Sequence, residues 1–132
     1  MRVLTILNSL DIGGIENTFL ECVPFLQKNN IKLHVSVYKR KGTIEKDFQN
    51  LGVRVLGIKK TNSILLDFLQ VYFLIKKHDI SIVHSRFGFS SGGYILACLF
   101  SSIPSIVSIH NTHPSRRKNF FIRLIQSYSL FL

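Results

Sequence analysis

Short apolar runs alternate with longer amphipathic stretches along the whole chain. The short runs are rich in β-branched residues, which favour strands, and the longer stretches repeat apolar positions every three or four residues, which favours helices. The pattern predicts strands over residues 2–8, 32–38, 53–56, 81–84 and 105–109. It predicts helices over residues 15–28, 44–51, 64–77, 91–101 and 115–131. Each predicted strand is thus followed by a predicted helix.

This alternation predicts the fold class. Parallel strands joined by helices need right-handed crossovers, which place helices on both faces of one sheet. We therefore expect an α/β fold with a doubly wound parallel sheet. The length of 132 residues fits a single domain over residues 1–132.

Composition excludes several classes of protein. The hydrophobic fraction of 46% supplies a core and argues against disorder. The longest apolar runs end well short of the ~20 residues that span a bilayer, so no transmembrane helix is expected. Cys22 and Cys98 lie far apart in apolar stretches, without metal-ligand spacing. We expect both to be reduced core thiols of a cytoplasmic protein, and we expect no metal site.

The charge of the chain is strongly positive. Its 17 Lys and Arg residues against 7 Asp and Glu residues give a net charge of +10, and no acidic residue follows Asp79. Such a charge attracts nucleic acid, anionic lipid or phosphorylated substrates, although a solvated basic surface explains it equally well. Nucleic-acid binding rests on charge alone, because no recognised motif interleaves the scattered cations with aromatics, so no specific nucleic-acid partner is expected.

The predicted fold indicates where a ligand site should lie. In an open parallel sheet, ligands bind outside the carboxyl ends of the strands, near the point where the strand order reverses. Four polar segments follow predicted strands in this way: Asn8–Glu16, Tyr38–Thr43, His84–Gly93 and His110–Arg117. The candidate functional residues should come from these segments.

Two glycines, Gly13 and Gly14, join the first strand to its helix. Glycine permits positive φ and close backbone approach, and the first amides of a helix attract anions, so this loop is a candidate diphosphate site. A tight turn that needs glycine only for packing is the alternative. The loop matches neither the G-x-G-x-x-G nor the P-loop pattern. Lys39–Lys41 after the second strand cannot bind ribose hydroxyls as an acid would, but suits a 2′-phosphate.

Histidines follow the fourth and fifth strands. His84 is followed by Arg86, and His110 by Asn111 and Thr112. A histidine at a strand end is more often structural than catalytic, but His110 should emerge at the edge where the glycine loop opens. The chain has no Cys-His pair, Ser-His-Asp order or clustered carboxylates, so proteolysis, thiol chemistry and two-carboxylate hydrolysis lack support.

An ordered set of segments carries a resemblance to a known family. The set comprises the first strand with Gly13–Glu16, Gly42–Glu45, Leu51–Val55, Asp79–Ser85, Ile103-Pro104 and Ile109–Thr112. In this order and spacing they resemble the N-terminal, Rossmann-like domain of GT-B glycosyltransferases of family 4. The resemblance covers nearly the whole chain. It implies retaining transfer of a hexosyl group from a nucleotide-diphosphate sugar to a glycan or lipid-linked acceptor, as in polysaccharide biosynthesis.

The resemblance also implies roles for single residues. Gly13 and Gly14 match the loop that closes over the donor diphosphate, and His110 matches the strand-end histidine that contacts the transferred sugar. It makes His84, Arg86, Asn111 and Thr112 candidates for binding the acceptor or sugar. The family commonly has a second histidine where this chain has Arg86, which could instead pair with an acceptor phosphate. No metal or other cofactor is implied.

The family fold includes a second Rossmann-like domain that holds the nucleotide. We expect residues 1–132 to be the acceptor-side domain alone, incomplete at its C-terminal end, without the C-terminal nucleotide-sugar-binding domain and inactive by itself. The residues leave an alternative open, namely a non-catalytic Rossmann-like nucleotide- or phosphate-binding module that uses the glycine loop and Lys39–Lys41.

Two predicted helices carry apolar surfaces, and the sequence leaves two alternatives open for each. Residues 116–131 combine cations with an apolar face, which either lies on anionic lipid at the inner membrane face or packs on the sheet. The helix over 64–77 is apolar nearly all round, with a polar stripe of Asp67, Gln70 and Lys77, so it is either buried or in contact with a partner.

Overall fold

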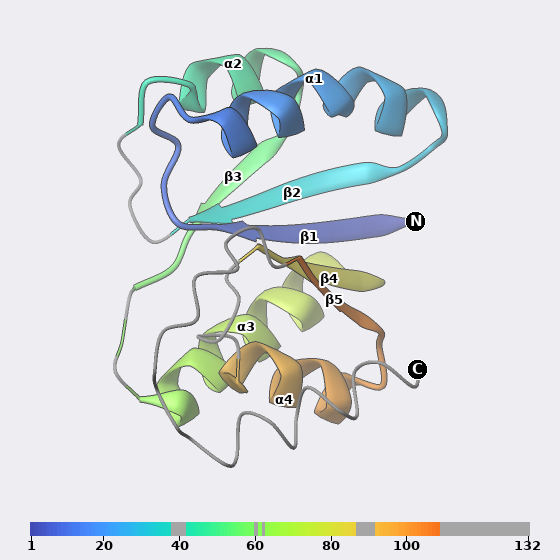
Figure 1. Ribbon diagram of the computed structural model, residues 1–132. Coiled ribbons are helices and arrows are strands. Elements are labelled where there is room, and N and C mark those ends of the chain that lie inside the picture. The colour runs from blue at the N-terminus through green and yellow to red at the C-terminus, as the bar shows by residue number, and fades with distance from the viewer. Residues whose placement is uncertain (38–41, 60, 62, 87–91, 109–132) are drawn as a thin grey trace.

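Strands and helices alternate along the part of the chain that the computed structural model describes, namely residues 1–37, 42–59, 61, 63–86 and 92–108 (Figure 1). The strands are β1 (Arg2–Leu7), β2 (Lys32–Val37), β3 (Arg54–Gly57), β4 (Ile82–Ser85) and β5 (Ser105–Val107). The helices are α1 (Gly14–Lys28), α2 (Glu45–Asn50), α3 (Ile64–His78) and α4 (Gly92–Ser101). These elements confirm the predicted ones to within two residues at each end, while the predicted helix over 115–131 lies outside the described residues.

The five strands form one parallel sheet in the order β3-β2-β1-β4-β5. Helices α1 and α2 cover one face, and α3 and α4 cover the other (Figure 1). The chain first builds outward from β1 to β3 and then crosses over to β4 and β5, so the order reverses between β1 and β4. The predicted doubly wound α/β fold is confirmed, and in folds of this kind ligands bind outside the carboxyl ends of the strands at the point of reversal.

Alternation along the central strands divides the core between the two faces. In β1, Leu4 and Ile6 join the cluster under α3 and α4, whereas Leu7 joins the cluster under α1 and α2. Successive side chains of a strand point to opposite faces, which is why a run of apolar residues can supply both clusters. The same alternation assigns every polar strand residue to a face.

Glycines shape two helix boundaries. Helix α2 ends before Gly52, whose φ of 74° is left-handed and suits glycine. A Cβ on Gly93 would lie only 2.8 Å from the carbonyl oxygen of Ile64, so this glycine lets α4 pack closely on α3.

One expectation about the thiols is wrong. Cys98 is buried, and burial raises its pKa to about 12, but Cys22 is exposed on α1. The buried stripe of α1 runs through Phe19 and Val23, and Cys22 lies about 60° around the helix from Phe19, at the margin of that stripe. Because the thiolate is the reactive form, the raised pKa leaves Cys98 an unreactive core thiol at neutral pH.

Helix α3 exposes much of its apolar surface. Val71 and Ile75 are buried against the sheet, while the exposed large side chains are Ile64, Leu65, Leu66, Leu69 and Phe73. Of the two outcomes expected for this helix, full burial is therefore wrong for the described part of the chain.

Candidate functional site at the carboxyl edge of the sheet

The glycine loop begins helix α1 at the carboxyl edge. Gly13 is the N-cap residue, with an extended φ of −149°, and its carbonyl accepts a 3.0 Å hydrogen bond from the N–H of Asn17. Neither Gly13 nor Gly14 adopts a positive φ, so of the two properties of glycine considered for this loop, close backbone approach is the one that applies. No side chain of the described residues caps the helix, and the first-turn amides of α1 retain the donors that every helix N-terminus leaves unpaired within the helix.

The space around Gly13 and Gly14 shows whether packing requires glycine at these positions. A Cβ on Gly14 would meet nothing within 4 Å among the described residues, and a Cβ on Gly13 would meet chiefly the carboxylate of the flexible Glu16 side chain. Packing within the described part of the chain therefore does not require glycine at position 14. This favours a loop that leaves room for a ligand over a turn that needs glycine only to pack.

Glu16 brings a negative charge to the same helix end. It stands in the first turn of α1, three residues after the N-cap Gly13. A carboxylate there interacts favourably with the positive end of the helix dipole. A diphosphate that binds at this helix end must therefore share it with, or displace, the Glu16 carboxylate.

Gly42 fixes the shape of the loop that precedes α1. A Cβ at this position would overlap the backbone carbonyl of Leu10, and the N–H of Ile44 donates a 3.1 Å hydrogen bond to the same carbonyl oxygen. The segment after β2 is thereby packed against the segment after β1. Gly42 belongs to the segments that carry the family resemblance, but no local pattern indicates its role, because its contact with Leu10 joins distant parts of the chain.

Arg86 lies at the carboxyl end of β4 and reaches α1. Its N–H donates a 3.2 Å hydrogen bond to the carbonyl of Ile6, and its guanidinium carbon stands 4.9 Å from the centroid of the Phe19 ring. This is the range of a cation–π contact. The structure therefore brings Arg86 to the same helix that the glycine loop begins.

His84 is tied to the end of β5. Its Nε2 lies 2.7 Å from the Oγ of Ser108, and the N–H of Ser108 donates a 2.9 Å hydrogen bond to the carbonyl of Ser85. The half-buried imidazole thus links the ends of two neighbouring strands. This contact supports a positioning role within the edge, and acceptor binding by His84 stays a prediction.

The other predicted site residues lie outside the described residues. These are His110, Asn111 and Thr112, the basic segment Lys39–Lys41, and the surface over 116–131. Ser108, two residues before His110, stands at the carboxyl edge beside His84. Their roles stay predictions.

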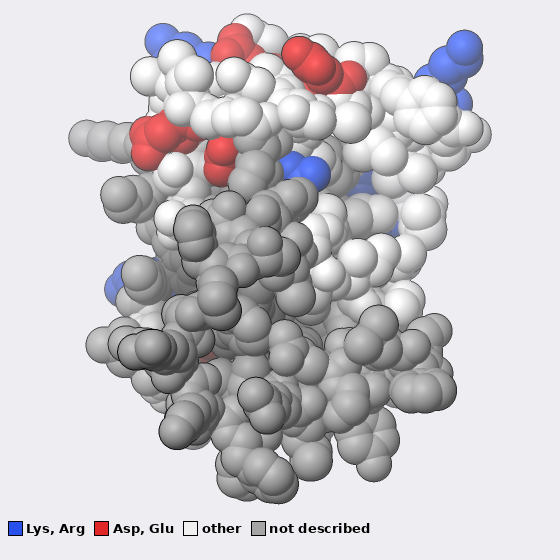
Figure 2. Space-filling model, viewed as in Figure 1, with Lys and Arg blue, Asp and Glu red and all other residues white. Residues whose placement is uncertain are grey.

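Charges near this edge are mixed. Figure 2 shows acidic side chains gathered over α1 and α2, where Glu16, Glu21, Glu45 and Asp47 lie.

Within the described ranges, no three His, Cys, Asp or Glu side chains form a group that could hold a metal ion. No helix in those ranges has the length and apolar character needed to cross a membrane.

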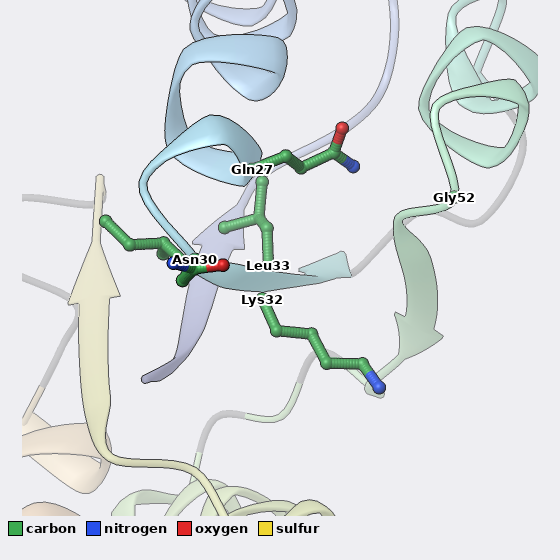
Figure 3. A pocket seen from close by; sticks show the side chains of 6 residues that line it. Gln27, Asn30, Lys32, Leu33 and Gly52 are labelled. Atoms are coloured by element: carbon green, nitrogen blue, oxygen red, sulfur yellow. The ribbon is translucent and has the colours of Figure 1, made fainter.

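A pocket of about 360 Å³ lies at the opposite, amino edge of the sheet (Figure 3). It is lined by Gln27, Asn30, Ile31, Lys32, Leu33 and Gly52. The Gln27 amide donates a 2.5 Å hydrogen bond to the carbonyl of Leu51, so it is already used in joining α1 to the end of α2. With one cation and no other ionisable side chain, this pocket lacks the groups that catalysis needs.

The sheet order and the glycine loop after β1 are those of doubly wound α/β domains. Such domains bind ligands where the strand order reverses, which in this sheet is between β1 and β4. Residues 12–131 match the model of Glycosyltransferase Family 4, and the chain belongs to this family, as its sequence predicts. A comparison with curated proteins found no match.

Solved structures show the same fold in longer proteins. A glycosyltransferase from Rickettsia africae aligns with a TM-score of 0.70 and 18% identity, over 92% of this chain and 34% of that one. Anabaena HepE, in complex with UDP and glucose, aligns with a TM-score of 0.66 and 12% identity, over 98% and 35%. The UDP-GlcNAc 2-epimerase of Neisseria meningitidis, bound to UDP-GlcNAc, aligns with a TM-score of 0.58 and 16% identity, over 98% and 38%. The chain spans about a third of the length of these proteins.

Proposed function

We propose that this chain is the acceptor-side domain of a glycosyltransferase that moves a hexosyl group from a nucleotide-diphosphate sugar to a glycan or lipid-linked acceptor, with retention of configuration. Family membership supports the reaction class. The observation that carries the proposal is the start of α1 at the carboxyl edge, with open space beside Gly14.

In this proposal the α1 N-terminus acts on the leaving diphosphate. Negative charge grows on the diphosphate as the bond to the sugar breaks, and preorganised helix amides stabilise such charge. The missing Cβ at Gly14 lets the diphosphate approach. Arg86 supplies a fixed positive charge over Phe19, suited to a phosphate of the acceptor. His110 contacts the transferred sugar, and Asn111 and Thr112 contact the sugar or acceptor.

The rest of the proposed enzyme lies beyond this domain. A second Rossmann-like domain would hold the nucleotide, so the chain by itself should not turn over substrate. The reaction would take place in the cytoplasm, with residues 116–131 on the inner membrane face if the acceptor is lipid-linked. No metal ion or other cofactor is part of the proposal.

Gly14→Ala tests the diphosphate site. In the 132-residue chain, UDP-glucose at millimolar concentration should shift the backbone amide resonances of residues 14–16. The added methyl should weaken this binding about tenfold while the fold is kept, since it meets no described atom. Cys22→Ala changes an exposed residue of the same helix and should leave binding unchanged. Equal binding by Gly14→Ala and the unaltered chain would contradict the proposal.

Turnover tests the sugar contact. The chain would be joined to the C-terminal half of a family 4 glycosyltransferase, and His110→Ala should then reduce turnover by about two orders of magnitude, in the range for loss of one stabilising group. Unchanged turnover removes His110 from the mechanism. Stabilisation of the chain by NADP, with none by UDP-glucose, would instead favour the non-catalytic nucleotide-binding module.

A further inference from the structure

A second cavity, of about 200 Å³, opens at the amino edge of the sheet on the face that α3 covers. It is lined by Arg2, Lys32, His34, Arg54, Lys77, His78 and Asp79. The glycine loop lies at the other edge of the sheet and begins a helix on the other face, so this cavity is separate from the proposed donor site.

Strand register brings these side chains together. Arg2 of β1 is paired with Lys32 of β2, and His34 of β2 is paired with Arg54 of β3. All four share the face of Leu4, which packs under α3. Figure 3 shows Lys32 and Leu33 leaving β2 in opposite directions, with Leu33 toward α1. Lys77 and His78 reach the same place from the last turn of α3.

The cavity holds more positive charge than its own acid can balance. Four cations and one carboxylate line it. Asp79 forms an ion pair with Arg2 across the start of β1. Lys32, Arg54 and Lys77 form no ion pair within the described part of the chain. Like charges on neighbouring strands repel each other, and a bound anion would remove this repulsion.

His34 supplies an independent sign of a ligand. It is only 2% exposed, and its Nδ1 has no hydrogen-bond partner among the described residues. Its ring lies 5.4 Å from the ring of His78, centroid to centroid. A buried polar atom without a partner is costly, so native structures generally provide one. Here the ring borders the cavity, from which a ligand oxygen could accept its hydrogen bond.

The pKa values of both histidines are lowered by their surroundings. Burial lowers the pKa of His34, and the charges of His78, Arg54, Lys32 and Arg2 lower it further. Burial also lowers the pKa of His78, with added effects from Lys77 and Arg54. A neutral imidazole still has one N–H donor, and a bound anion would favour its protonation.

We propose that this cavity binds a phosphate group. Lys32, Arg54 and Lys77 supply the charge, and His34 with His78 supplies directed hydrogen bonds. Guanidinium and ammonium groups together are the usual protein partners of phosphate. The cavity is smaller than the roughly 300–1,000 Å³ of pockets that hold drug-sized ligands, so it suits a single phosphate and not a nucleotide sugar.

The test is titration of the 132-residue chain with inorganic phosphate at neutral pH and constant ionic strength, with the histidine ring resonances as the readout. Phosphate should shift the His34 and His78 signals saturably and raise the pKa of both rings, while chloride should not. Lys32→Gln with Arg54→Gln should weaken binding at least about tenfold, because two of the three unpaired cations are lost. Lys28→Gln removes the same kind of charge from the exposed end of α1, on the other face, and should change affinity less than about twofold.

The double variant should fold, since its substitutions relieve repulsion at exposed positions; Lys77→Gln on α3 provides a second, independent variant with the same expectation. Undiminished phosphate binding by these variants, or equal shifts with chloride, would overturn the proposal.

Vesicles of phosphatidylcholine with and without phosphatidic acid distinguish the source of the phosphate. Binding to free phosphate alone assigns a soluble ligand, and vesicle binding that the double variant loses assigns a lipid headgroup. UDP-glucose binding at the glycine loop should be the same in all these variants, which separates this test from that of the proposed function.

Discussion

The two edges of the sheet use opposite electrostatic devices. At the carboxyl edge a helix begins, so backbone amides supply the positive potential, and the first turn of that helix carries the acid Glu16. At the amino edge α3 ends, so the backbone contributes negative potential, and the last turn carries Lys76, Lys77 and His78. The parallel topology therefore places the N-terminus of α1 at the carboxyl edge and the C-terminus of α3 at the amino edge. In the first turn of α1 and the last turn of α3, the charged side chains have the sign opposite to that of the helix end itself.

At the amino edge, the cations outnumber those in the last turn of α3. The basic last turn of α3 matches the negative end of its dipole. Arg2, Lys32 and Arg54 come from strand starts instead, and their charge is added to that of the helix. The excess is what makes the amino edge a candidate anion site, whereas the carboxyl edge relies on backbone and on Arg86.

Gly42→Ala should have the largest effect, and it acts on the carboxyl edge alone. The new Cβ would overlap the Leu10 carbonyl, and backbone cannot move aside as a side-chain end can. We expect a loss of about 3 kcal/mol in the free energy of unfolding, the upper part of the range for overpacking. Urea unfolding measures it. A loss below about 0.5 kcal/mol would mean that Leu10 and Gly42 are not in contact in solution.

The second largest effect should be a loss of stability in acid, caused by His34 and His78 at the amino edge. The pKa of His34 and that of His78 are lowered in the folded state, so the unfolded chain binds more protons as the pH falls below the ordinary value of 6.5. The contribution of both residues is complete above that pH and is lost as the pH falls toward their folded pKa values. Urea unfolding in phosphate-free buffer from pH 7.5 to about 5.5, above most carboxylate titration, measures this loss. His34→Gln with His78→Gln should flatten the profile; an unchanged slope would place the acid sensitivity elsewhere.

Gly14→Ala should separate stability from binding at the carboxyl edge. Alanine has the higher helix propensity and meets no described atom, so the free energy of unfolding should rise by about 0.5 kcal/mol. Binding of UDP-glucose should fall in the same variant. Thermal unfolding provides the measurement of stability, and a destabilised variant would show that the glycine serves packing after all.

The smallest expected effect is a gain at the amino edge. Arg54→Gln removes one of the repelling cations, so in phosphate-free buffer the free energy of unfolding should rise by a few tenths of a kcal/mol, as is usual for exposed charges. Added sodium chloride should shrink the difference from the unaltered chain by screening. A variant less stable than the unaltered chain at every salt concentration would show that Arg54 is held by attraction and not repulsion.

Sequence patterns predicted the elements because each depends on neighbours along the chain. The alternation within β1 and the spacing in α1 are local, as is the glycine loop between them, so the fold class and the position of Gly13 and Gly14 followed directly. The contact of Gly42 with Leu10 and the grouping of Arg2, Lys32 and Arg54 depend on strand order and register, which no local pattern contains. A basic residue at the start of three strands was the available signal for the second site.

Exposure along helices was predicted less well. Apolar spacing suggested that Cys22 is buried, but its place depends on the direction in which α1 meets the sheet. The all-round apolar character of α3 likewise left burial and exposure open. The structure shows that Leu65 and Phe73 are exposed, which depends on how α3 packs on the sheet. Periodicity identifies a helix, whereas tertiary packing decides which part of its apolar surface is covered.

Mapping of UDP-glucose on the isotopically labelled 132-residue chain tests the central claim, that the carboxyl edge holds the donor diphosphate. Saturable shifts should be confined to the amides of residues 13–16 and their neighbours at the ends of β1 and β4. The ring signals of His34 and His78 should stay unchanged. Shifts centred on these two histidines, or none at residues 13–16, would contradict the account.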